Sequence, residues 1–213
     1  MTERGMIFNG EMVRAILDGR KTQTRRPVKF PILDRNLGCE LAGNELAGEL
    51  SAGNYLNSAF GKPGDRIWVR ETFQGPLFDY DLMDSYCKDP TPFEKPEFCV
   101  YKADGAPAPE FYDADGELHC YWRPSIHMPR WASRILLEIT DVRVERLNAI
   151  SQEDAQAEGM ELAGWRPTYS DPDSGGEVMT PYDNFAELWS SIYGEESWNA
   201  NPWVWVISFK RVE

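Results

Sequence analysis

The segment Ile135–Leu147 constrains the fold of this 213-residue chain more than any other. Apolar and polar residues alternate along it almost strictly, and this period of two is typical of a β-strand with one face in a core. Two further segments predict strands. Arg66–Phe73 alternates with Ile67 and Val69 on the inward face, and Trp203–Phe209 is apolar enough for a central strand. The chain therefore has to build a sheet.

Helical patterns accompany these strands. The segment Met12–Asp18 has apolar residues three and four apart, and Gly19 follows at the position of a left-handed C-cap. Ser151 begins a capping-box pattern and a second helix that runs through Glu158. A third helix is predicted over Asn184–Ile192, with one apolar face. Strands and helices together predict an α+β protein.

The composition is that of a folded chain, with 42% hydrophobic and 13% aromatic residues, enough to form a core. No apolar run reaches about 18 residues, which argues against a membrane span, and the N-terminus lacks the apolar stretch of a secretory signal. We therefore expect a cytoplasmic protein. The four cysteines form no Cys-x-x-Cys pair and the chain has two histidines, so we expect free thiols and no metal site.

Charge is distributed unevenly along the chain. The net charge is −13, which argues against a protein that binds nucleic-acid backbones. Residues 1–30 nevertheless contain seven lysines and arginines against three acidic residues, a local balance of +4. A basic pocket in an acidic body favours a small anionic or polar ligand.

The stretch Gly19–Arg26 contains the candidate chemistry. Lys21 lies beside two threonine hydroxyls, those of Thr22 and Thr24. A lysine beside a hydroxyl can act as a base in nucleophilic catalysis, provided that its amine is neutral. Burial and the neighbouring arginines would both lower the pKa of this lysine. The alternative interpretation is a solvated basic turn without a catalytic role.

Three blocks, in this order, resemble the ASCH domain, a branch of the PUA-like superfamily. Gly19–Arg26 is similar to the signature turn of that domain, Lys62–Val69 to its Gly-Asp strand, and Asp154–Met160 to its third block. The whole chain also resembles the longer ASCH proteins of bacteriophage and prophage genomes. The resemblance extends over residues 7–29, 62–74, 133–160 and 184–211.

The resemblance implies a more specific fold than the periodicity does. That fold is α+β, a PUA-like small mixed β-barrel, partly open, with helices packed around it. It implies one domain over residues 1–213. Because minimal members of the family are shorter, residues near 34–60, 75–125 and 163–183 are expected to be long loop insertions.

One group of similar proteins, the small bacterial N4-acetylcytidine amidohydrolases, uses a threonine, a lysine and a glutamate. At the matching positions, the resemblance implies that Lys21, Thr24 and Glu158 are catalytic and that neither a metal nor an organic cofactor is needed. Thr24 would attack the acyl carbonyl after passing its proton to neutral Lys21. Glu158 would shuttle a proton to the leaving amine or orient Lys21, and Thr22 is the rival hydroxyl.

The spacing of the two proposed groups sets a condition on this mechanism. Lys21 and Thr24 are three residues apart, so a regular strand would place their side chains on opposite faces. They converge if the chain turns between them, and the break at Gly19 makes such a turn plausible.

Further side chains are candidates for binding the substrate, a modified pyrimidine nucleoside. Trp68 offers a plane on which a base can stack, although a core or rim tryptophan fits equally well. Glu71 could accept a hydrogen bond from a pyrimidine amino group, whereas an exposed ion pair with Arg70 is the alternative. Arg26 could bind a carbonyl or phosphate oxygen, and Thr22 lies in the same stretch.

Two other classes of function remain open. The first is an RNA-binding or RNA-processing module. The acidic net charge disfavours it, and so does the absence of a basic stripe interleaved with aromatic residues outside the N-terminal turn. The second is a protein that retains this fold for protein–protein contact without catalysis.

Overall fold

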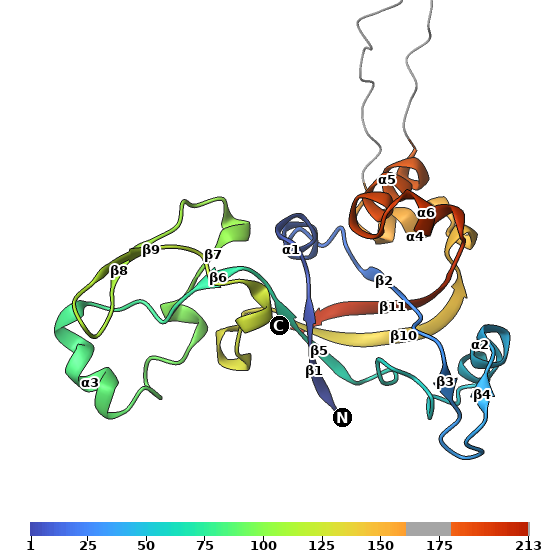
Figure 1. Cartoon of the computed structure of the whole chain (residues 1–213), viewed down its shortest axis with the longest axis horizontal. Helices are drawn as coiled ribbons and strands as arrows, with labels where there is room; N and C mark the ends of the chain where they lie inside the picture. Colours follow the sequence, from blue (N-terminus) through green and yellow to red (C-terminus); the bar gives the residue numbers. More distant parts are fainter. Residues whose placement is uncertain (161–179, 213) are drawn as a thin grey trace, which may run out of the picture. The chain divides into compact units, whose positions relative to one another are not determined.

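The computed structural model describes residues 1–160 and 180–212 (Figure 1). It is a mixed α+β structure, as the periodicity predicts, and its largest sheet contains both parallel and antiparallel pairs. The chain forms two compact units. The first unit comprises Met1–Leu17, Asp65–Glu138 and the C-terminal residues from Arg211, and the second comprises Asp18–Gly64 and Ile139–Lys210.

Three strands meet in the first unit. Strand β1 (Glu3–Ile7) runs parallel to β5 (Arg66–Arg70), and β5 pairs antiparallel with the start of β10 (Leu136–Arg146). Along β5, Ile67 and Val69 are buried and their neighbours are half-buried. The predicted alternation is therefore confirmed.

The first helix, α1 (Gly10–Leu17), also belongs to the first unit. It begins two residues before the predicted segment and buries Val13, Ala15 and Ile16. Gly19 follows it with a φ of 75°, the left-handed conformation that the sequence predicts for a residue beyond a helix end.

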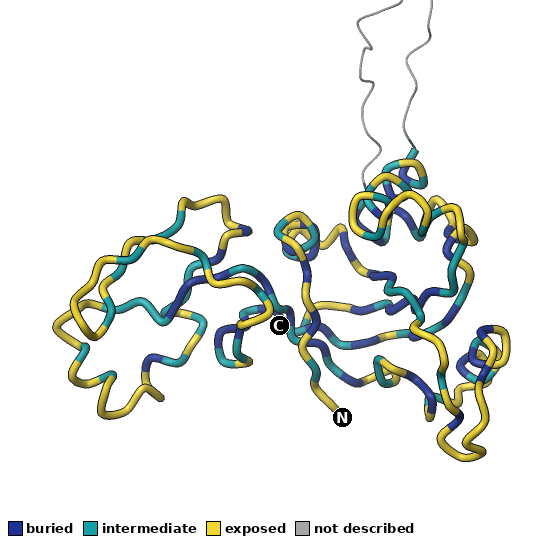
Figure 2. The backbone as a smooth tube through the Cα atoms, viewed as in Figure 1, coloured by how far each residue is buried: buried dark blue, intermediate teal, exposed yellow. Residues whose placement is uncertain are grey.

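The remainder of the first unit is a long excursion with short elements, which includes the expected insertion near residues 75–125. Figure 2 shows that most of it is exposed or half-buried, whereas β5 alternates between half-buried and buried residues. Phe73, Tyr101, Met128 and Ala132 form a small hydrophobic cluster of their own, which the sequence analysis did not anticipate. The elements are β6 (Phe73–Gln74), α3 (Met83–Lys88), β7 (Val100–Tyr101), β8 (Glu110–Tyr112), β9 (Leu118–Cys120) and the 3-10 helices η1 (Tyr80–Leu82), η2 (Pro96–Phe98), η3 (Lys102–Asp104), η4 (Ser125–His127) and η5 (Arg130–Ala132).

In the second unit, β2 (Gln23–Pro27) pairs antiparallel with β11 (Trp203–Val212), and Thr24 lies opposite Ile207. The predicted apolar C-terminal strand is thus confirmed. The hydrogen-bonded strand order is β1-β5-β10-β11-β2, and the boundary between the units falls within β10 and within β11. No sheet closes on itself in the described residues, so the structure is a mixed open sheet with helices.

Two helices of the second unit begin at side-chain caps. Ser151 Oγ accepts a hydrogen bond from the backbone N–H of Asp154, and α4 (Gln152–Ala157) follows, as predicted. Thr180 and Asp183 cap α5 reciprocally, and therefore α5 (Pro181–Tyr193) begins three residues before the predicted helix. The other elements are β3 (Ile32–Leu33), β4 (Glu40–Leu41), α2 (Gly43–Ser51), η6 (Leu147–Ala149) and α6 (Glu195–Asn199).

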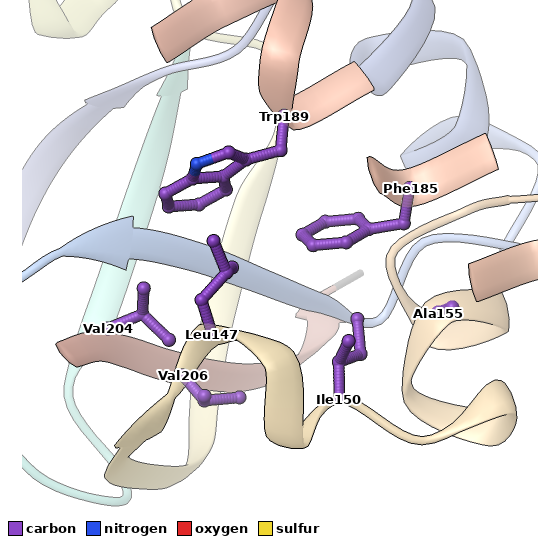
Figure 3. Packing of buried hydrophobic residues seen from close by; sticks show 7 residues of the cluster. All are labelled: Leu147, Ile150, Ala155, Phe185, Trp189, Val204 and Val206. Carbon is purple, nitrogen blue, oxygen red and sulfur yellow. The ribbon is translucent and has the colours of Figure 1, made fainter. Parts of the chain in front are cut away.

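The core of the second unit lies between these helices and β11. In Figure 3, Phe185 and Trp189 extend from α5 toward Leu147 and toward Val204 and Val206 of β11. All five side chains are buried. Because Val204 and Val206 are two residues apart, they lie on one face of β11. This face turns toward α5.

Two of the three expected insertions, 34–60 and 75–125, lie within the described residues. Residues 34–60, which have weak periodicity, contain strand β4 and helix α2. The third expected insertion, 163–183, lies mostly outside the described residues, which resume at residue 180. No helix in the described part of the chain is long and apolar enough to cross a membrane.

Candidate active site

The predicted catalytic lysine lies where the chain enters β2. Lys21 forms an isolated antiparallel bridge with Glu158, which follows directly after α4. The next residue is held on both sides, since Thr22 donates its N–H to Ala157 and accepts from the N–H of Phe209, both at 2.8 Å. The backbone around Lys21 is therefore fixed between the end of α4 and strand β11.

The Lys21 side chain is fully buried and contacts Glu158 twice. Its Nζ donates to Glu158 Oε2 at 2.6 Å and to the Glu158 backbone oxygen at 2.9 Å. The relative exposure of the two side chains is 0% and 3%. The lysine and the glutamate of the predicted triad are thus in direct contact, with little water around them.

Arg25 holds the other side of the same carboxylate. One of its terminal nitrogens donates to Glu158 Oε1 at 3.2 Å and to Gln23 Oε1 at 2.5 Å. The second terminal nitrogen donates to Glu145 at 2.7 Å and to Asp154 at 3.0 Å. Glu158 therefore has a different cation at each of its two carboxylate oxygens.

Side-chain alternation explains this convergence. In an extended chain, residues two apart lie on the same face, and Lys21, Gln23 and Arg25 all bond to groups of α4 or to the residue after it. Gln23 donates to Asp154 at 3.1 Å and to the Ser208 hydroxyl at 3.3 Å. The sequence carries this signal as Lys-x-Gln-x-Arg, although only the charge of Arg25 entered the predicted site.

Thr24 lies on β2 between Gln23 and Arg25, so alternation directs its side chain to the opposite face. It is buried. Thr22 is exposed, and Arg26 is half-buried. The backbone oxygen of Thr22 accepts from the N–H of Phe209, one position beyond the β2–β11 register that begins at Gln23, so no turn separates Thr22 from Thr24.

Burial controls the protonation of the lysine. Desolvation lowers the pKa of Lys21 below its ordinary value; the charge and hydrogen bond of Glu158 oppose this, and the charges of Arg26 and Arg25 reinforce it. A lysine with a lowered pKa beside a carboxylate is suited to acid–base chemistry.

The outer part of this network is partly solvated. Although burial opposes the shift, the hydrogen bond from Gln23 and the charges of Arg143 and Arg25 lower the pKa of Asp154. Arg143 donates to Asp154 at 2.9 Å and to Glu145 at 3.1 Å. Asp154 and Glu145 therefore bridge the two arginines.

The other predicted binding residues belong to the first unit. The guanidinium of Arg70 lies 5.4 Å from the Trp68 ring centroid and donates to the backbone oxygen of Ile126. A β-carbon added to Gly5 would lie 2.6 Å from the Trp68 ring, so the indole packs against that backbone. Trp68 and Arg70 thus contact each other.

Glu71 is a buried ion-pair residue. Arg134 donates to both of its carboxylate oxygens at 3.0 Å, and to both oxygens of Asp104 at 2.9 and 2.7 Å. Desolvation raises the pKa of Glu71, and the bonds from Arg134 oppose this. The alternative predicted for Glu71 is an exposed ion pair, whereas the ion pair in the structure is with Arg134 and leaves Glu71 only 1% exposed.

The predicted residues thus fall into two groups. Lys21, Thr22, Thr24, Arg26 and Glu158 belong to the second unit, whereas Trp68, Arg70 and Glu71 belong to the first. Direct contact is present between Lys21 and Glu158.

A separate open hollow of about 420 Å³ lies in the second unit. It is lined by two aromatic residues, two acidic residues and a short apolar stretch: Phe30, Trp203, Glu40, Glu45, Leu41, Ala42 and Gly43. None of the predicted site residues lines it. Glu45 also caps α2 by accepting from the backbone N–H of Ala42.

The chain matches no family model, no curated protein and no solved structure.

Proposed function

We propose that this protein is an amidohydrolase that cleaves the N4-acyl amide of acylated cytosine or cytidine, on a PUA-like fold of the ASCH type. The observation that carries the proposal is the buried contact between Lys21 Nζ and Glu158 Oε2, at 2.6 Å. The substrate class comes from the resemblance of the Gly19–Arg26 stretch and of the block around Glu158 to N4-acetylcytidine amidohydrolases.

The pair supplies both proton transfers that amide hydrolysis requires. Neutral Lys21 takes the proton of the attacking hydroxyl as its oxygen bonds to the acyl carbon. The C–N bond then breaks, and a proton delivered through Glu158 converts the leaving nitrogen to the free 4-amino group. Water supplies the oxygen and the hydrogens, so the products are the amine and a carboxylic acid. Burial favours the neutral amine that starts this sequence.

Two nucleophiles fit this scheme, and the Thr24 side chain distinguishes them. The resemblance assigns the attack to the Thr24 hydroxyl. The alternation of β2 favours water, because Thr24 lies between Gln23 and Arg25, whose side chains bond to Asp154 and Glu158. If Thr24 is the nucleophile, Thr24→Val is inactive, Thr24→Ser retains activity, and rapid quenching traps one acyl group on the protein. If water attacks, Thr24→Val remains active and no acyl group is trapped.

Part of the basic stretch that an RNA-binding function would need is buried. Lys21 and Arg25 contribute to the basic stretch of the sequence, but both are buried against carboxylates. Arg20 is exposed and pairs with Asp18 at 3.0 Å. Phosphate binding relies on accessible cations, and two of the cations in this stretch are not accessible.

The first experiment is incubation of the purified protein with N4-acetylcytidine, with cytidine release followed by absorbance. We expect release by the wild type and by Lys29→Ala, which changes an exposed lysine near β2, and none by Lys21→Ala. Circular dichroism establishes that each variant is folded. No release by the folded wild type at high concentration rejects the hydrolase. A salt-dependent RNA complex would then support the alternative.

A further inference from the structure

The Arg25 side chain is fully buried. It contacts Glu158 Oε1, while Lys21 contacts Glu158 Oε2. The carboxylate is thus held at both ends by cations of different chemistry. Arginine remains charged at any pH that a protein tolerates, whereas a buried lysine can lose its proton.

Arg25 is itself held rigidly. Its four terminal contacts are with Gln23, Glu145, Asp154 and Glu158, all within 3.2 Å. Its guanidinium also lies 5.8 Å from the centroid of the Phe185 ring. The planar fork of arginine satisfies several oxygens in fixed directions, which a lysine cannot reproduce.

The charges around Lys21 show why a second cation matters. The Lys21 amine is in contact with Glu158, and its neighbouring cations are Arg25 and Arg26. Arg25 is in turn surrounded by Asp154 of α4 and by Glu145 and Arg143 of β10. Without Arg25, removing the proton from Lys21 would leave Glu158 as a buried carboxylate with no cation in contact, which is costly. With Arg25 in place, Glu158 keeps a charged partner when Lys21 is neutral.

We propose that Arg25 is a positioning residue: it fixes the Glu158 carboxylate and supplies the lasting counter-charge that allows Lys21 to act as a neutral base. This inference rests on the proposed amidohydrolase function. It predicts two separable effects, because the charge of Arg25 acts on the proton of Lys21 and the fork of Arg25 acts on the direction of Glu158.

The sign of the first effect follows from the charges. Arg25 lowers the pKa of Lys21, so Arg25→Gln raises it. The acid limb of the kcat–pH profile, which reports the loss of neutral lysine, then moves to higher pH. Arg25→Lys keeps the charge and loses the fork, so kcat falls while the acid limb stays in place.

The test compares wild type, Arg25→Gln, Arg25→Lys and the control Arg143→Gln, which alters the same network without touching Glu158. Two quantities are measured from pH 6 to 10: kcat and KM for N4-acetylcytidine, and the 13Cε NMR titration of Lys21, assigned with Lys21→Arg. For Arg25→Gln we expect kcat to fall by about 100-fold, KM to change less than about threefold, and both titrations to move upward by about one pH unit.

Arg25→Lys is expected to lower kcat about tenfold without moving either titration, and Arg143→Gln to resemble the wild type. An unchanged Lys21 titration and acid limb in Arg25→Gln overturns the proposal, as does a defect confined to KM. If Arg25→Gln does not fold, an Arg25→Lys variant with wild-type kcat overturns it. If the wild type hydrolyses nothing, the hydrolase fails, while the NMR titration still decides whether Arg25 controls the proton of Lys21.

Discussion

Each unit of this protein buries one carboxylate against an arginine, but the two arrangements differ in kind. In the first unit, Glu71 receives two parallel bonds from Arg134, whose guanidinium lies 3.9 Å from the Tyr101 ring centroid. In the second, Glu158 is shared between Arg25 and Lys21. Both carboxylates are almost fully buried.

The difference is the presence of a cation that can lose its proton. Glu71 and Arg134 form a bidentate pair of fixed charge, which stabilises a geometry and offers no proton near neutral pH. At Glu158, Lys21 takes one of the two oxygens, and its burial favours the neutral amine. Burial of a carboxylate is therefore a weak indicator of function, and burial beside a lysine is a stronger one.

The largest expected effect tests whether only the cluster of Glu158, Lys21 and Arg25 is catalytic, and not the cluster of Glu71, Arg134 and Asp104. Glu158→Gln keeps the shape of the side chain and removes its charge, so kcat/KM should fall by roughly 10²–10⁴-fold. Asp104→Asn, at the exposed end of the Arg134 cluster, should stay within about threefold of wild type. Cytidine release from N4-acetylcytidine measures both. Equal losses in the two variants would remove the distinction between the clusters.

Stability should rank the clusters in the opposite order. Arg134→Met leaves Glu71 buried without its cation and should cost about 3–5 kcal/mol of unfolding free energy. Lys21→Met should cost less, about 1.5–3 kcal/mol of unfolding free energy. Arg25 still pairs with Glu158, and the substitution also removes the cost of burying an amine. Urea unfolding at pH 7 measures both losses. A larger loss in Lys21→Met would contradict the ranking.

The two clusters should also give opposite pH dependences of stability. The pKa of Lys21 is lowered in the folded state, so the unfolded chain binds more protons just below pH 10.5, and stability rises with pH there by at most about 1.4 kcal/mol per unit. The pKa of Glu71 is raised, so the folded state binds more protons just above pH 4.5, and stability falls with rising pH there.

Unfolding free energies measured across pH for wild type, Lys21→Met and Glu71→Gln isolate these contributions. Lys21→Met should remove the alkaline slope alone, and Glu71→Gln the acidic slope alone. If each variant flattened both regions, the clusters would not titrate independently.

The smallest effects are expected at the exposed ends of both clusters. The Arg143 side chain is 34% exposed and that of Asp104 is 47% exposed. Exposed ion pairs contribute little, so Arg143→Gln and Asp104→Asn should each change the unfolding free energy by less than about 1 kcal/mol. Thermal unfolding at low and high salt checks this. A loss of unfolding free energy comparable to that of Arg134→Met would mean that the partly solvated residues contribute as much to stability as the buried ones.

Much of the fold follows from local patterns. The alternation over Ile135–Leu147 predicts β10, and the serine cap at Ser151 predicts the start of α4, because strands and caps depend on near neighbours. The weak periodicity of residues 34–60 predicts either a loop or short helices, and the short helix α2 lies there. The start of α5 was misjudged because its cap, Thr180, lies outside the apolar pattern.

The candidate site also combines features that follow from the local sequence with features that follow from tertiary packing. The sequence by itself determined the order Lys-x-Gln-x-Arg, whose side chains share one side of the chain wherever it is extended, since side chains alternate. It also predicted that Gly159 ends the helix that begins at Ser151, and this glycine has a φ of 94°. Only the tertiary structure decided which carboxylates meet Arg25, because Glu145, Asp154 and Glu158 lie 120, 129 and 133 residues away along the chain. Local periodicity specifies which face a side chain occupies, whereas the group opposite that face is specified by how distant segments pack.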